Sequence, residues 1–192
     1  MPDTKLILAS GSSIRKQMLA DAGVVFEVIT SHVDEDLIKS TFVKETFPER
    51  VIELSKAKAK EVSKLYPGAL VIGADQMCVL GNENFDKPLE FSKAVANLTK
   101  LSGKTHIQFS GVCLYKDRKL IWEHSESAEL KMKPLTRNEI EAYIRLDDPL
   151  QCCGCYKFES NGADLFENIV GSENVIKGLA LEALLEALDK YN

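Results

Sequence analysis

The sequence predicts a mixed α/β fold, and two patterns of apolar residues lead to that prediction. Compact apolar runs at 6–9 and 70–72 are typical of buried strands, and segments with helical spacing lie between them. Further along, the alternating runs 107–115 and 120–131 flank the polar turn 116–118, which predicts an antiparallel hairpin. Strand–helix units followed by a hairpin indicate a mixed α/β protein.

The elements of the first half follow from local signals in chain order. The run 6–9 is expected to be a strand, and the small residues after it form a turn before an amphipathic helix near Ile14. The other expectations are a short strand at 25–29, an acidic loop at 30–36, a helix at 48–65, and a buried strand at 70–72 that ends near Asp75, with apolar residues 77–80 beyond.

The second half is predicted in the same way. Thr136 and Glu139 fit a capping box ahead of a helix that runs through Leu146. The other expectations are a turn at 81–84, a loop at 85–88, a helix near 92–101, a strand or short helix at 163–169, and a final helix at 179–188. No repeat or clear linker divides the chain, so residues 1–192 are expected to form a single domain.

Composition argues against several classes of protein. The 24 Lys and Arg residues against 29 Asp and Glu residues give a net charge of -5, which disfavours a nucleic-acid or acidic-membrane binder. The N-terminal apolar run is too short for a signal peptide, and no run of about 20 apolar residues could span a membrane. We therefore expect a cytoplasmic protein whose five cysteines are free thiols.

The turn from Ser10 to Arg15 is the strongest local signal for a ligand. It lies between a predicted strand and a predicted helix, where small residues and a helix N-terminus let backbone amides approach an anion. Ser10 and Ser12 supply hydroxyl groups, and Arg15 supplies a two-pronged cation suited to phosphate. The alternative is an ordinary serine helix cap followed by a surface arginine.

Carboxylates and lysines elsewhere could complete such a site. Asp75 follows a buried strand, where a carboxylate can hold a metal or deprotonate water, and Glu35 could be a second ligand for the same ion. The alternatives are a turn-capping Asp75 and a solvated Glu35. Lys58 and Lys87 are possible phosphate partners, but spacing does not distinguish Lys58 from the other lysines of its helix.

Two other motifs are interpreted as structural. The segment Ser102-Gly103-Lys104-Thr105 resembles the end of a P-loop, but Leu98 stands where a P-loop has its first glycine. A P-loop also lies between a strand and a following helix, whereas this segment lies between a predicted helix and a following strand. Cys152 and Cys155 form one C-x-x-C pair without the second pair that a zinc site needs.

Seven short segments occur in a characteristic order: 6–15, 33–35, 72–76, 87–88, 101–104, 153–156 and 178–179. Taken together they resemble the Maf (septum-formation) family of nucleoside triphosphate pyrophosphatases, over nearly the whole chain from Leu6 to Leu188. The resemblance implies a Maf/inosine-triphosphatase-like mixed sheet with two lobes around a nucleotide-binding cleft, as a homodimer. It implies hydrolysis of a nucleoside triphosphate between the α and β phosphorus atoms, giving a monophosphate and pyrophosphate.

The resemblance also implies roles for individual residues. Glu35 and Asp75 would hold Mg²⁺ or Mn²⁺, and Asp75 would orient or deprotonate the attacking water. The residues implied to bind the triphosphate are Ser10, Ser12, Arg15, Lys58 and Lys87.

The segments around Gln76 and at 148–159 look closer to the 7-methyl-GTP pyrophosphatase branch of the family. Gln76 and Glu159 lie at positions expected to help choose the base, and an acidic Glu159 suits the N–H donors of guanine. Ile14 stands where that branch would have a tryptophan to stack on a cationic base, and Ser13 and Asp86 also depart from the family pattern. There are two alternatives: a dTTP/UTP pyrophosphatase, and a nucleotide-binding regulator of cell division with weak or no catalysis.

Overall fold

A computed structural model describes residues 5–191 of the chain. The chain divides into two compact units. Unit 1 contains the described residues up to Asp75, Ser110–Glu126 and those from Gly178 onward, and unit 2 contains Gln76–Phe109 and Ser127–Lys177. The single domain expected over 1–192 stays a prediction, because compactness does not decide whether either unit folds alone.

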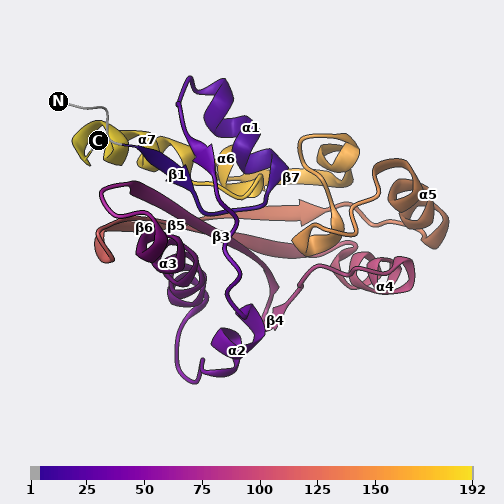
Figure 1. The fold of residues 1–192 in the computed structure, drawn as a ribbon. Coiled ribbons are helices and arrows are strands. Elements are labelled where there is room, and N and C mark those ends of the chain that lie inside the picture. The colour runs from indigo at the N-terminus through magenta and orange to yellow at the C-terminus, as the bar shows by residue number, and fades with distance from the viewer. Residues whose placement is uncertain (1–4, 192) are drawn as a thin grey trace. The chain divides into compact units, whose positions relative to one another are not determined.

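The described residues form a mixture of helices and strands (Figure 1). The strands are β1 (Leu6–Leu8), β2 (Glu27–Val28), β3 (Leu70–Leu80), β4 (Glu83–Asn84), β5 (Thr105–Lys116), β6 (Lys119–Met132) and β7 (Phe166–Val170). The helices are α1 (Ser13–Asp21), α2 (Glu35–Ser40), α3 (Phe47–Leu65), α4 (Phe91–Leu101), α5 (Arg137–Asp147), α6 (Glu173–Ile176) and α7 (Leu181–Tyr191), with 3-10 turns η1 (Cys153–Cys155) and η2 (Asn161–Leu165). None of these helices is both long and apolar enough to cross a bilayer.

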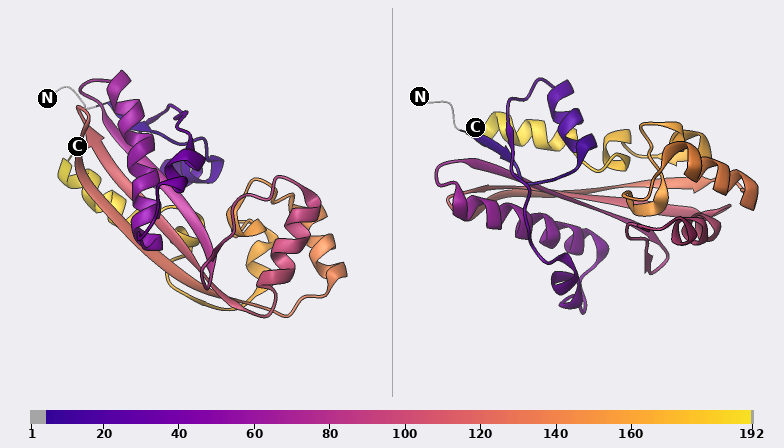
Figure 2. Two further views of the ribbon diagram at one scale, coloured as in Figure 1. Left: turned by 90° about the horizontal axis from the view of Figure 1, so that it is seen from below. Right: turned by 45° about the vertical axis from the view of Figure 1, so that its right-hand side comes forward.

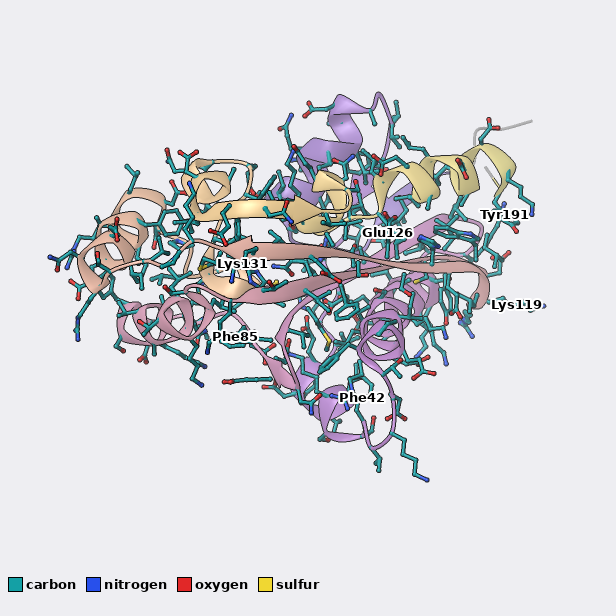
Figure 3. The ribbon with its side chains drawn as sticks, turned by 180° about the vertical axis from the view of Figure 1, so that it is seen from behind. Phe42, Phe85, Lys119, Glu126, Lys131 and Tyr191 are labelled. Atoms are coloured by element: carbon teal, nitrogen blue, oxygen red, sulfur yellow. The ribbon has the colours of Figure 1, made fainter. Side chains whose placement is uncertain are left out.

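The strands follow the order β2-β1-β3-β5-β6-β7, and β4 pairs with β3. β1 is parallel to β2 and β3, whereas β4 and β7 are antiparallel to their partners. The turn between β5 and β6 consists of Asp117 and Arg118, both with positive φ (50° and 66°), as a two-residue hairpin requires. Figure 3 labels Lys119 at this turn. The predicted mixed α/β class and the predicted hairpin are therefore confirmed.

In unit 1, α3 runs along one face of the strands, and α1 and α7 lie on the other face (Figures 1 and 2). The backbone of α3 packs directly on two strand glycines. A Cβ atom at Gly73 would lie 2.2 Å from the Ser55 carbonyl oxygen, and one at Gly111 would lie 2.8 Å from the Val51 backbone. The Ser55 hydroxyl also donates to the Gly111 carbonyl at 2.9 Å. This contact determines how closely α3 approaches the strands.

In unit 2, α4 and α5 pack against each other. The predicted capping box at the start of α5 is present: the Thr136 hydroxyl accepts from the Glu139 amide, and the Glu139 carboxylate accepts from the Thr136 amide. Buried leucine and isoleucine side chains from both helices form the core here: Leu98, Leu101, Ile140 and Ile144.

Three local expectations need correction. The acidic loop at 30–36 ends earlier than expected, because Asp34 caps α2 by accepting from the Leu37 amide, so Glu35 is helical. The strand at 70–72 does not end near Asp75, since pairing with neighbouring strands continues it to Leu80. The four-residue helix α6, capped by Ser172, was not expected at all.

Candidate functional site

The parallel pairing of β1 and β3 places the serine turn beside the middle of β3. Leu8 lies opposite Ile72, and the Ala9 amide donates to the Ile72 carbonyl at 2.8 Å. The chain that leaves β1 therefore passes Ala74 and Asp75. Ligand groups of α/β proteins gather at the carboxyl ends of such strands.

Ser12 is the N-cap of α1, and its hydroxyl accepts from the Arg15 amide at 3.4 Å. The Ser10 hydroxyl accepts from the Ser12 amide at 3.3 Å. The helix cap considered from the sequence is therefore present. Because both hydroxyl oxygens act as acceptors here, each hydroxyl proton can still be donated to a ligand.

Arg15 is not a surface residue. Its side chain is buried, its Nε donates to the Gly178 carbonyl at 2.7 Å, and its Nη1 donates to the Ala74 carbonyl at 2.9 Å and to the Ser10 hydroxyl at 3.2 Å. The guanidinium thus joins the serine turn, β3 and the segment before α7. These bonds fix the Arg15 guanidinium beside Ala74, the residue that precedes Asp75.

Lys58 joins the two carboxylates that the sequence analysis singled out. Its ammonium lies 2.5 Å from Asp75 Oδ1 and 2.8 Å from Glu35 Oε1. The Lys58 and Asp75 side chains are each 11% exposed, whereas Glu35 is 40% exposed. One buried cation therefore bridges a carboxylate on β3 and a carboxylate in the first turn of α2.

The packing of α3 explains why Lys58 reaches Asp75. Alternate residues of a strand share a face, so Asp75 points to the same side of β3 as Gly73, the side on which α3 lies. Ser55 and Ala59 contact the Gly73 position, and Lys58 lies between them in sequence, on the next part of the helix surface. The absence of a side chain at Gly73 lets α3 come close enough for this ion pair.

The Glu35–Asp75 pair also fits a divalent cation. Both carboxylates direct an oxygen at one positive centre, and Mg²⁺ is often held by one or two carboxylates together with substrate phosphates. Among residues 5–191 there is no cluster of three or more His, Cys, Asp or Glu side chains that could hold a metal. These two carboxylates therefore suit an ion that the substrate helps to coordinate.

The remaining predicted residues lie in unit 2, apart from Ile14, which is half-buried in the first turn of α1. Lys87 and Glu159 are both exposed, in the loop before α4 and in the turn after η1. Burial raises the pKa of the Cys152 thiol, the Glu159 charge raises this pKa further, and the Lys87 charge lowers it. The two charges therefore both act on the turn around Cys152.

Gln76 directly follows Asp75 on β3, and its amide is held by the protein. Its Nε2 donates to the Ile176 carbonyl at 2.7 Å and to the Val175 carbonyl at 3.2 Å, and its Oε1 accepts from the Cys153 thiol at 3.3 Å. Both amide hydrogens are thus used, and one acceptor position remains on Oε1.

Sequence reasoning did not find Cys153 as a contact of a predicted site residue. The C-x-x-C spacing draws attention to Cys152 and Cys155, whereas the contact with Gln76 depends on the fold of η1. A groove between α4 and α5, lined by residues such as Val95 and Glu141, contains none of the predicted site residues.

The fold and these contacts define a mixed α/β protein in which two carboxylates and two buried cations meet at the carboxyl end of a parallel strand pair. The chain belongs to the Maf family, since the family model described as Maf-like protein matches residues 5–191.

Two relatives of known name, both about 40% identical to this chain, support this membership. A protein named nucleoside triphosphate pyrophosphatase from Legionella pneumophila (strain Corby) is 41% identical over 183 residues, covering 95% of this chain and 92% of the relative. A protein named 7-methyl-GTP pyrophosphatase from Rhizobium etli is 39% identical over 188 residues, covering 96% of this chain and 94% of the relative. A solved HAM1 protein from Coxiella burnetii superposes with a TM-score of 0.47 at 13% identity, covering 97% and 99% of the two chains.

Proposed function

We propose that this chain is a metal-dependent nucleoside triphosphate pyrophosphatase of the cytoplasm, active as a homodimer, with 7-methyl-GTP as its preferred substrate. The observation that carries the proposal is the Glu35–Lys58–Asp75 cluster beside the buried Arg15. The names of the relatives agree with the reaction: several are nucleoside triphosphate pyrophosphatases, and two rhizobial ones are 7-methyl-GTP pyrophosphatases.

The residues of unit 1 suit binding of a triphosphate. Arg15 and Lys58 are buried cations that can neutralise phosphate oxygens, and the hydroxyls of Ser10 and Ser12 can donate to them. Lys87, exposed in unit 2, is the third proposed cation. Reduction of charge repulsion is the main task in attack on a phosphoanhydride, and fixed cations perform it without reorganisation.

Glu35 and Asp75 would hold Mg²⁺ or Mn²⁺, which would polarise the phosphate under attack. Asp75 is the proposed general base, because it is the more buried carboxylate and the Lys58 ammonium holds one of its oxygens in place. Its other oxygen, Oδ2, could then accept a proton from water. Lys58 keeps Asp75 and Glu35 close together before any ligand arrives.

The preference for 7-methyl-GTP depends on residues of unit 2. An exposed carboxylate at Glu159 can accept from the N–H groups of a guanine edge and favours a positively charged base. A dTTP/UTP pyrophosphatase is the second candidate, because Ile14 offers no aromatic surface for stacking a methylated guanine.

The test is pyrophosphate release from 7-methyl-GTP, GTP, UTP and dTTP, with Mg²⁺ or Mn²⁺ and with a chelator. Asp75→Asn should reduce turnover about 100-fold or more if Asp75 is the base, with the fold intact by circular dichroism. Asp36→Asn, on the exposed side of the same acidic segment as Glu35, is the control and should retain activity. Tight nucleotide binding without metal-dependent release would support a binding protein instead and refute the proposed reaction.

A further inference from the structure

We propose that Cys153 is a positioning residue for base selection: its thiol, together with two backbone carbonyls, holds the Gln76 amide in one orientation and so helps to determine which base edge Gln76 can bind. The inference rests on the proposed function, together with the role in base choice that the family resemblance implies for Gln76. It assigns a role to a cysteine that belongs to neither the phosphate-binding nor the metal-binding set.

The orientation of the Gln76 amide follows from its partners. Two backbone carbonyls, of Val175 and Ile176, lie 3.2 Å and 2.7 Å from Nε2, and a carbonyl oxygen can only accept. The amide nitrogen must therefore face them, and Oε1 must face Cys153. Since Oε1 can only accept, the thiol at 3.3 Å must be the donor.

The turn that carries Cys153 is itself held in one conformation. Gly154 has φ +73°, and its amide donates to the Phe85 carbonyl at 3.1 Å; Figure 3 labels Phe85. A Cβ atom at Gly154 would lie 2.8 Å from Cys78 Sγ, so only glycine fits there. Cys155 also has a positive φ of 63°, which is uncommon for a residue with a side chain. Strain of this kind persists only where surrounding contacts impose it, so the backbone that carries Cys153 has little freedom.

A second acceptor makes the Cys153 thiol part of a network. Gln108 Oε1 lies 3.8 Å from Sγ, farther than Gln76, while Gln108 Nε2 donates to the Tyr156 hydroxyl at 2.7 Å. The Tyr156 hydroxyl lies 2.9 Å from His106 Nε2, and burial lowers the pKa of His106 to about 4. The His106 ring is therefore uncharged at neutral pH. The Cys153 thiol has one proton to donate, and Gln76 Oε1 is the nearer of its two possible acceptors.

This arrangement has a consequence for the base. Both amide hydrogens of Gln76 are used within the protein, so Gln76 can offer the base only the remaining acceptor position on Oε1. It would select bases that present an N–H donor, as a guanine edge does. Without the thiol donor, the amide keeps its two bonds to the backbone carbonyls but loses the one that holds Oε1, so this oxygen is placed less precisely for the base.

The experiment compares Cys153→Ala, which removes the donor, with Cys153→Ser, which keeps one, and with Cys152→Ala as the control for loss of a neighbouring thiol. Steady-state rates are measured for the best and second-best nucleotides of the wild-type panel. Cys153→Ala should raise KM for the best nucleotide about five-fold, the usual value of one hydrogen bond, and leave kcat unchanged. Cys153→Ser and Cys152→Ala should behave as wild type.

Each variant is also made with Gln76→Ala. If Cys153 acts through Gln76, Cys153→Ala should cause no further change in that background. A KM effect that persists without Gln76, or no effect of Cys153→Ala on the ratio of the two nucleotides, would overturn the inference.

A readout that does not depend on activity separates this inference from the proposed reaction. The S–H stretching band of Cys153, identified by its loss in Cys153→Ala, should move to higher frequency in Gln76→Ala as the hydrogen bond disappears. An unmoved band would overturn the inference even in an active enzyme. Absence of pyrophosphate release by the wild type, with the band shift present, would refute the proposed function and leave the thiol–amide contact supported.

Discussion

Replacing Lys58 with methionine is the most direct perturbation of the charged cluster in unit 1. Methionine keeps a flexible stem of similar length but removes the ammonium that lies between Glu35 and Asp75. The two carboxylates would then face each other without a bridging cation. We expect both lower activity and lower stability.

Removing one partner from a buried ion pair costs about 3–5 kcal/mol, because a charge is left buried without compensation. Asp75 is 11% exposed and meets this condition, but Glu35 is 40% exposed and can turn toward solvent. We therefore expect the lower end, about 3 kcal/mol of unfolding free energy.

Lys56→Met is a matched control on the same helix. Lys56 also contacts two carboxylates, Glu53 at 2.9 Å and Glu123 at 2.7 Å, but these are 50% and 42% exposed. Exposed pairs are worth about 0.5 kcal/mol each, so this variant should lose about 1 kcal/mol. With a urea slope of about 2 kcal/mol/M, the midpoint of Lys58→Met should lie about 1 M below that of Lys56→Met.

Equal midpoints for the two variants would refute the view that Lys58 compensates a buried carboxylate. Divalent cations provide a second check. Mg²⁺ or Mn²⁺ should raise the urea midpoint of Lys58→Met more than that of Lys56→Met, because only in Lys58→Met has the ammonium that competes with the ion for Glu35 and Asp75 been removed.

Three further predictions concern residues around the site and the core. Arg15→Lys keeps the charge but cannot span the carbonyls of Ala74 and Gly178, so urea denaturation should show a loss of about 2 kcal/mol; unchanged stability would contradict the proposed anchoring role. Burial lowers the pKa of His106 from 6.5 to about 4, so the unfolded chain binds a proton first as the pH falls through this window. Stability should therefore decrease by about 3 kcal/mol between pH 6.5 and pH 4, and His106→Asn should flatten that decrease, whereas parallel pH curves would argue against it. Gly73→Ala would place a Cβ 2.2 Å from the Ser55 carbonyl oxygen and push α3 away from β3. The variant should therefore lose about 2 kcal/mol of unfolding free energy and release pyrophosphate more slowly. A fully active and stable variant would show that the close approach of α3 is dispensable.

The elements that the sequence predicted well are those whose signals are local. The capping box of α5 lies within four residues, and the β5–β6 turn is marked by polar residues between two alternating runs. α2 was missed because none of its six residues is buried, so it has no apolar periodicity to detect. The length of β3 was underestimated because β4 pairs with its end, and that partner is not visible in the segment itself.

The site was only partly predictable for a related reason. The serine turn and Asp75 could be singled out because each follows an apolar strand. Lys58 could not, since Lys56, Lys58 and Lys60 occur at equal spacing on one helix. In the structure Lys56 pairs with exposed carboxylates, Lys60 is exposed, and Lys58 is buried against Asp75.

The difference between these lysines originates on another strand. A helix turns by 100° per residue, so lysines two positions apart point to nearly opposite sides of the helix. The side of α3 that faces the sheet therefore determines which lysine is buried. Gly73 determines that side, because the α3 backbone at Ser55 can sit against β3 only where no Cβ intervenes. Two residues beyond Gly73, on the same face of the strand, stands Asp75. A glycine with no chemistry of its own therefore selects one lysine of three as the partner of the proposed catalytic carboxylate.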